Sequence, residues 1–188
     1  DKTTSNIWKQ ELIRGFEGSK LYYIAARPGM GKTSLMLEDA MHLAKSNYSV
    51  GICSLEMSKR EITTRCISID TGINAFRIKS KNISDLEAGR ILQSKLFSSK
   101  LHIFDKPAQT RIDVRGFAQQ IISTTGLDIL FIDYLQIMVD ESASNREREV
   151  AKLSSSLKAL SKELDIPVVA LLQLSRAVEQ RPDKKPQS

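Results

Sequence analysis

The sequence predicts an α/β fold, built as a mostly parallel twisted sheet with helices on both faces. Short apolar runs rich in β-branched residues alternate with longer amphipathic stretches, which is typical of parallel strands joined by crossover helices. A glycine-containing segment lies between the first apolar run and the first amphipathic stretch, as in strand-loop-helix phosphate sites. The chain has 188 residues, of which 41% are hydrophobic and 27% charged, and this suits one well-packed domain.

The expected elements follow this alternation along the chain. Strands are expected over the short apolar runs, at residues 21–26, 50–55, 101–104, 128–133 and 167–172. Helices are expected over the amphipathic stretches, at residues 32–46, 59–71, 85–98, 111–124 and 146–164. Residues 139–145 are small and polar, so a loop is expected there.

Two kinds of signal support the helix assignments. Capping-box spacing predicts helix starts at two serines, because each hydroxyl and its partner carboxylate satisfy backbone N–H groups that lack a helical partner. The two boxes pair Ser58 with Glu61 and Ser84 with Glu87. In the last helix, apolar residues recur every three or four positions and predict one stripe against the sheet, made of Val150, Leu153, Leu157, Leu160 and Leu164.

Composition narrows the class of protein without naming a function. No apolar run approaches the roughly 18 residues of a membrane-spanning helix, and residues 1–14 lack the apolar centre of a secretory signal, so a cytoplasmic protein is expected. Cys53 and Cys66 fall in apolar strand and helix patterns, which favours buried, reduced thiols over a disulfide. His42 and His102 have no partners at ligand spacing, so no structural metal site is expected. The net charge of +6 is compatible with a polyanionic partner, but ordinary solubility explains it equally well.

The most specific motif is a phosphate-binding loop. The segment Ala26-Arg27-Pro28-Gly29-Met30-Gly31-Lys32-Thr33 matches GxxxxGK(S/T) at every fixed position except the first, where alanine replaces glycine. Gly29 and Gly31 can adopt backbone angles that turn successive N–H groups inward, and the following helix start adds a partial positive charge. Lys32 is expected to bridge the β- and γ-phosphates of ATP, and the Thr33 hydroxyl is expected to bind Mg²⁺.

Three polar residues at strand ends are candidates for the chemistry. Asp133 ends an apolar strand, as does the carboxylate that holds Mg²⁺ in P-loop enzymes. Glu56 follows the strand at 50–55 and is expected at the same edge of the sheet, where a carboxylate can orient and deprotonate the attacking water. Gln173 follows the last strand and is a candidate sensor of the γ-phosphate. The alternative for each is an ordinary polar residue that caps a turn or faces solvent.

Several strings together resemble the DnaB-type replicative DNA helicases, from Gly15 to Lys185. Besides the phosphate loop they are Ser54-Leu55-Glu56-Met57-Ser58, Phe131-Ile132-Asp133-Tyr134-Leu135-Gln136, Ser156-Leu157-Lys158-Ala159-Leu160-Ser161-Lys162-Glu163-Leu164 and Gln173-Leu174-Ser175-Arg176-Ala177-Val178-Glu179-Gln180-Arg181. The resemblance implies a RecA-like P-loop NTPase core that hydrolyses ATP with Mg²⁺ and translocates on single-stranded DNA. It also implies a ring of six subunits, with primase and a helicase loader as further partners.

The resemblance also implies residue roles. Glu56 corresponds to the catalytic base and Gln173 to the γ-phosphate sensor, while Arg65 is expected to reach the nucleotide unless it is simply a solvated helix residue. The loops after Asp133 and Gln173 correspond to DNA-facing segments. Their candidate phosphate contacts, for which ordinary solvated charges are the alternative, are Arg146, Arg148, Lys184 and Lys185.

The resemblance predicts three parts: residues 1–14 as a linker or N-terminal helix, 15–180 as the RecA-like ATPase domain, and 181–188 as a flexible tail leading into a DNA-binding loop. Residues 7–13 are expected either to dock on a neighbouring subunit or to pack on their own domain.

The family continues past the tail into strands that carry an arginine finger, so we expect the chain alone to bind ATP but to hydrolyse it poorly. The alternatives to a helicase motor are another RecA-like ATPase, such as a recombinase or regulatory ATPase, and a nucleotide-binding assembly module with weak hydrolysis.

Overall fold

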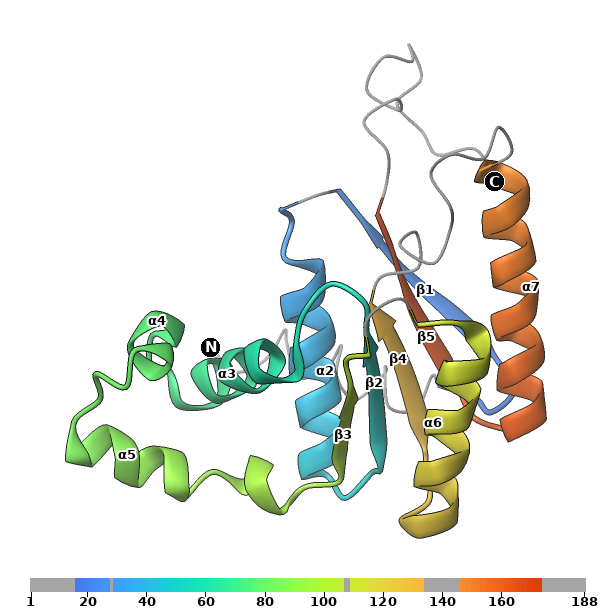
Figure 1. Cartoon of the computed structure of the whole chain (residues 1–188). Coiled ribbons are helices and arrows are strands. Elements are labelled where there is room, and N and C mark those ends of the chain that lie inside the picture. Colours follow the sequence, from blue (N-terminus) through green and yellow to red (C-terminus); the bar gives the residue numbers. More distant parts are fainter. Residues whose placement is uncertain (1–15, 28, 107–108, 134–145, 174–188) are drawn as a thin grey trace.

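A parallel sheet is the centre of the structure. The computed structural model describes residues 16–27, 29–106, 109–133 and 146–173, with the backbone alone at residues 146–150. Within them, a five-stranded sheet has the order β1-β5-β4-β2-β3, and every pair of neighbouring strands is parallel (Figure 1). The strands are β1 (Leu21–Ala26), β2 (Val50–Ser54), β3 (Leu101–Phe104), β4 (Ile129–Asp133) and β5 (Val168–Gln173).

Helices cover both faces of this sheet and build two apolar cores. Helices α2 (Lys32–Lys45) and α3 (Lys59–Thr71) lie on one face, and α6 (Arg111–Thr124) and α7 (Arg146–Leu164) lie on the other (Figure 1). Because successive strand side chains point to opposite faces, Phe131 packs toward α2 while Leu130 and Ile132 pack toward α6 and α7. The expected α/β fold with helices on both faces is confirmed.

The expected elements agree with the observed ones to within a residue at most boundaries. Both expected capping boxes form, at Ser58 with Glu61 and at Ser84 with Glu87. The apolar stripe of α7 packs in the second core through Leu153, Leu157, Leu160 and Leu164. The side chain of Val150 lies outside the described residues, as do residues 7–13, the expected loop at 139–145 and the tail at 181–188.

One expected helix is interrupted. Instead of a single helix over 85–98, the chain forms α5 (Asp85–Leu92) and then a short 3₁₀ helix, η1 (Lys95–Ser98). The cause is Ser94, whose hydroxyl accepts a hydrogen bond from the Leu96 backbone N–H group at 3.1 Å and thereby caps η1. The same hydroxyl donates to Asp70 of α3, so a tertiary contact fixes the break.

One further helix was not expected. Helix α4 (Ala75–Lys79) has only five residues, which is too few to produce a helical period in the sequence. Asn74 caps it by accepting a hydrogen bond from the Phe76 backbone N–H group at 2.8 Å.

Cys53 and Cys66 are both buried and free. In the part of the chain that the structure describes, no helix is both long and apolar enough to cross a membrane.

Candidate nucleotide site

The parallel sheet brings the predicted site residues to one edge. The phosphate loop follows β1, Glu56 follows β2, Asp133 ends β4 and Gln173 ends β5. Strand register pairs Ala26 with Gln173 and Ser54 with Asp133. Because the carboxyl ends of parallel strands meet at one edge, these segments, far apart in the sequence, come together at the edge where open α/β sheets bind their ligands.

The phosphate loop has the backbone shape that its glycines predict. Gly29 and Gly31 both have φ of 77°, a left-handed conformation that residues with a side chain rarely adopt. A Cβ atom at either position would meet nothing within 4 Å, so glycine is needed there for its backbone freedom and not for space. Gly31 is the N-cap of α2 and supplies no side-chain cap, so the first N–H groups of this helix are available to phosphate oxygens. Pro28 lies outside the described residues.

Thr33 and Asp133 connect the phosphate loop to the sheet. The Thr33 hydroxyl donates a hydrogen bond to Asp133 Oδ2 at 2.9 Å, which joins the first turn of α2 to the end of β4. Asp133 is 1% exposed, and its Oδ1 atom is buried with no hydrogen-bond partner among the described residues. A buried carboxylate with an unsatisfied oxygen, beside a hydroxyl, is a donor set that fits Mg²⁺.

The charges around Asp133 influence one another. Burial raises the pKa of Asp133, and the Thr33 hydrogen bond and the Lys32 charge oppose this rise. Burial lowers the pKa of Lys32, and the carboxylates of Asp133 and Glu56 oppose this fall. Glu56 also raises the pKa of Asp133, while Arg65 lowers it. Perturbed ionisable groups around a phosphate loop are typical of a functional site.

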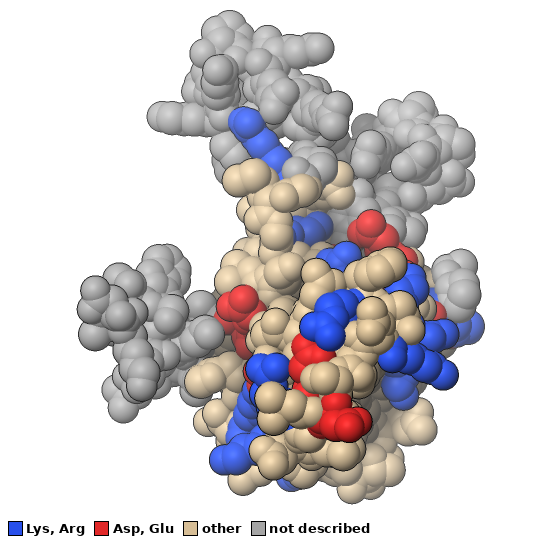
Figure 2. All heavy atoms as spheres, turned by 90° about the vertical axis from the view of Figure 1, so that its left-hand side faces the viewer, with Lys and Arg blue, Asp and Glu red and all other residues tan. Residues whose placement is uncertain are grey.

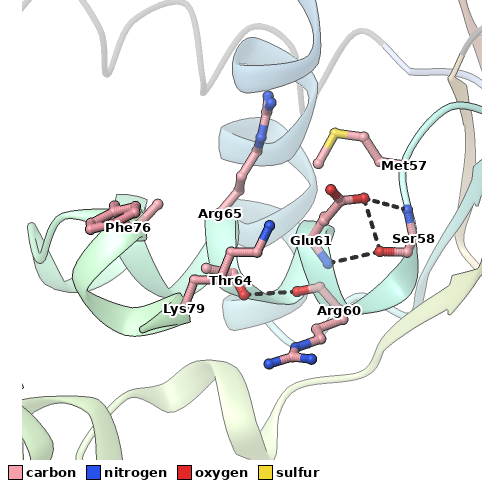
Figure 3. Close-up of a pocket in the computed structure, with 9 residues that line it drawn as sticks. Met57, Ser58, Arg60, Glu61, Thr64, Arg65, Phe76 and Lys79 are labelled. Carbon is pink, nitrogen blue, oxygen red and sulfur yellow. Dashed lines mark hydrogen bonds between the residues drawn. The ribbon is translucent and has the colours of Figure 1, made fainter. Parts of the chain in front are cut away.

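Arg65 lies on α3, next to a hollow that the sequence did not predict. This hollow, of about 470 Å³, opens between α3 and α4 beside the segment that follows Glu56 (Figure 3). It is lined by Met57, Ser58, Arg60, Glu61, Thr64, Arg65, Ala75, Phe76 and Lys79. The Glu61 carboxylate lies in the capping box with Ser58, as Figure 3 shows, and accepts its hydrogen bonds from this residue, which caps α3. No signal in the sequence marks this hollow, because it depends on the short helix α4.

The candidate DNA contacts stay predictions. The side chains of Arg146 and Arg148, in the first turn of α7, lie outside the described residues, as do Lys184 and Lys185. On the face that includes α4 and α5, Lys and Arg side chains are spread out with Asp and Glu side chains between them (Figure 2). One such pair is the bidentate contact of Arg77 with Glu87, at 2.5 and 2.8 Å. The positive charge is therefore partly paired on this face.

The parallel sheet and the phosphate loop after its first strand define the class of RecA-like P-loop domains. The family model for the DnaB-like helicase C terminal domain matches residues 6–188, and the chain belongs to that family. This confirms the resemblance predicted from the sequence.

Relatives and solved structures agree with this family. The chain is 39% identical over 180 residues to the replicative DNA helicase DnaB of Geobacillus stearothermophilus, covering 93% of this chain and 40% of the relative. It is 40% identical over 186 residues to the replicative DNA helicase DnaB of Rickettsia bellii, covering 92% and 37%. The chain therefore spans well under half the length of these curated relatives.

Two solved structures share the fold. The structure of a DnaB-like replicative helicase and its interactions with primase matches with a TM-score of 0.80 at 34% identity, over 95% of this chain and 45% of that one. A second solved structure, that of an ATPase domain, matches with a TM-score of 0.79 at 30% identity, over 100% of this chain and 77% of that one.

Proposed function

We propose that this chain is the ATP-hydrolysing motor part of a replicative DNA helicase, acting in the cytoplasm on single-stranded DNA. The observation that carries the proposal is the hydrogen bond from Thr33 to the buried Asp133, at the end of a glycine loop with the backbone shape of a phosphate cradle. Membership of the DnaB-like helicase family supports it, since relatives that align with nearly all of the chain are replicative DNA helicases.

ATP and Mg²⁺ are the proposed cofactors. The N–H groups of the loop from Ala26 to Thr33 would surround the phosphates, and Lys32 would balance their charge. Thr33 and Asp133 would hold Mg²⁺, which supplies charge neutralisation at the phosphates when bound. A cation there would also offset the cost of burying the Asp133 carboxylate, which is the cost that raises its pKa.

The hydrolytic step is assigned to groups on the neighbouring strand ends. Glu56 is exposed at the carboxyl edge of the sheet, so its carboxylate is free to orient and deprotonate a water. We assign Gln173 to sensing the γ-phosphate and Arg65 to stabilising the nucleotide's negative charge.

The proposed contacts to DNA phosphates are Arg146, Arg148, Lys184 and Lys185. They would act within a ring of six copies, which would bind primase and a helicase loader.

ATP turnover, measured with and without single-stranded DNA while particle mass is recorded, tests this function. We expect DNA to raise turnover and Lys32→Ala to abolish it, while Lys20→Ala, an exposed lysine just before β1, keeps turnover unchanged. Unchanged turnover in Lys32→Ala would refute the site. Turnover that is independent of DNA in a persistent monomer would argue against a motor, and nucleotide binding without turnover would favour an assembly module.

A further inference from the structure

The Gln109 side chain connects β2 and β3 just beyond the last paired residues of the two strands. The ladder between these strands ends at the pair Cys53 and Phe104. Beyond it, the Gln109 side chain donates from Nε2 to the backbone oxygen of Ser54 at 2.7 Å and to that of Phe104 at 3.2 Å. Gln109 is 3% exposed, so its amide satisfies a buried carbonyl of β2 that β3 no longer reaches.

Residues 55–58, between β2 and α3, form the loop that carries Glu56, called the Glu56 loop below, and Asp105 holds the far side of this loop. Its Oδ2 atom accepts a hydrogen bond at 2.6 Å from the backbone N–H group of Lys59, the first residue of α3. Gln109 therefore holds the chain two residues before Glu56, and Asp105 holds it three residues after. Both contacts come from the segment that follows β3, and neither residue belongs to a motif found in the sequence.

The remaining sides of this loop are also fixed. The Leu55 backbone N–H group donates to the Asp133 backbone oxygen at 2.7 Å, which continues the pairing of β2 with β4. The Met57 backbone N–H group donates to the Ser54 hydroxyl at 3.0 Å. Glu56 itself is exposed, so the position of its carboxylate depends on how firmly the backbone on either side is held.

The hydrogen bonds that the structure describes for the Gln109 amide both come from its Nε2 atom. Its Oε1 atom is buried without a hydrogen-bond partner among the described residues, which is unfavourable for folding. An apolar side chain of similar size would avoid that cost, although it would leave the Ser54 carbonyl unpaired. The two bonds from Nε2 are therefore the contribution that this side chain makes.

We propose that Asp105 and Gln109 are positioning residues that hold the Glu56 loop at a fixed place beside the phosphate site. This inference rests on the proposed function, because Glu56 must act on the attacking water for its placement to matter. Misplacing a catalytic group by about 1 Å costs on the order of 100-fold in rate. Loss of both contacts should therefore slow hydrolysis without weakening the binding of nucleotide at the phosphate loop.

The test compares the double variant Asp105→Ala with Gln109→Leu against wild type in the full chain. We expect turnover at saturating ATP to fall by roughly 10- to 100-fold, while the affinity for ADP stays within about twofold. Hydrogen exchange should become faster at the backbone amides of residues 54–59 and stay unchanged at residues 31–35. The matched control combines Asp128→Ala, which removes an equivalent aspartate bond to the Ser49 backbone at 2.6 Å, with Gln120→Leu on the exposed side of α6.

Three results would overturn the inference. They are wild-type turnover in the double variant, unchanged exchange at residues 54–59, and a loss of ADP affinity as large as the loss of turnover, which would indicate general damage. Lys32→Ala in the same series separates the two proposals. If Lys32→Ala loses turnover but the double variant does not, only the inference about Asp105 and Gln109 fails, whereas full turnover in Lys32→Ala rejects the proposed function itself.

Discussion

Replacing Asp133 with asparagine distinguishes the contribution of Mg²⁺ to nucleotide binding from that of the phosphate loop. Asparagine keeps the shape of the side chain, and its oxygen can accept the hydrogen bond that the Thr33 hydroxyl donates to Asp133 Oδ2 at 2.9 Å in the wild-type chain. It removes the buried negative charge, whose cost raises the pKa of Asp133. It also places an amide N–H group where Oδ1 now lacks a partner, and an unsatisfied buried donor costs about 1–3 kcal/mol. These effects oppose each other, so the nucleotide-free protein should unfold at nearly the wild-type temperature.

The effect of ligand on the melting temperature is where the variant should differ. A ligand at about 100 times its Kd stabilises the folded state by about 2.7 kcal/mol. For a chain of this size, about 1 kcal/mol shifts the melting temperature by roughly 2–4 °C, so Mg·ADP should raise it by about 5–11 °C. If Asp133→Asn weakens Mg·ADP binding about 100-fold, only about 0.4 kcal/mol remains, a shift of roughly 1 °C.

Thermal unfolding with ADP, in the presence of Mg²⁺ or of a chelator, measures this difference. We expect the Mg²⁺-dependent part of the shift to disappear in Asp133→Asn, while the part due to the phosphate loop alone is retained. Asp128→Asn is the matched control, because Asp128 immediately precedes the other end of β4 and should keep the whole shift. A full Mg²⁺-dependent shift in Asp133→Asn would refute the assignment of Asp133 to the metal.

Three further predictions concern the fold. Leu157 is a fully buried residue of α7, so Leu157→Ala should lower the free energy of unfolding, measured by urea denaturation, by about 2–5 kcal/mol. A loss below about 1 kcal/mol would contradict the packing of Leu157 in the core. Burial raises the pKa of the Cys53 and Cys66 thiols, that of Cys66 to about 11. Iodoacetamide at pH 8 should therefore label both thiols slowly until urea unfolds the chain. Rapid labelling of the folded chain would contradict their burial. Hydrogen bonds from Lys106 and from the start of α6 lower the pKa of Asp113. The unfolded chain therefore binds a proton there more readily, and stability should fall as pH drops below the ordinary pKa of the carboxyl. Asp113→Asn should flatten this pH dependence in denaturation curves, and an unchanged slope would count against these bonds.

The parts of the site that the sequence predicted are those encoded by neighbouring residues. The phosphate loop is one continuous motif, and its glycines have the predicted left-handed backbone. The sequence predicts Glu56 and Asp133 because Glu56 follows one apolar strand and Asp133 ends another, and a parallel sheet brings all such strand ends to one edge. Gln109 carries no such signal, because its role arises only where β2 and β3 separate in space. Ser94 was missed for the same reason, since its bond to Asp70 of α3 is a tertiary contact.

Asp133 links the two halves of the site, and this makes their contributions interdependent. Its side chain accepts from Thr33 at the phosphate loop, while its backbone oxygen accepts from the Leu55 N–H group just before Glu56. Substitutions at residues that share a partner do not add in free energy. Thr33→Val combined with Asp133→Asn should therefore lose little more turnover than the more damaging single variant. Losses that multiply in the double variant would mean that Thr33 and Asp133 act on the nucleotide independently, and the shared metal would then have to be abandoned.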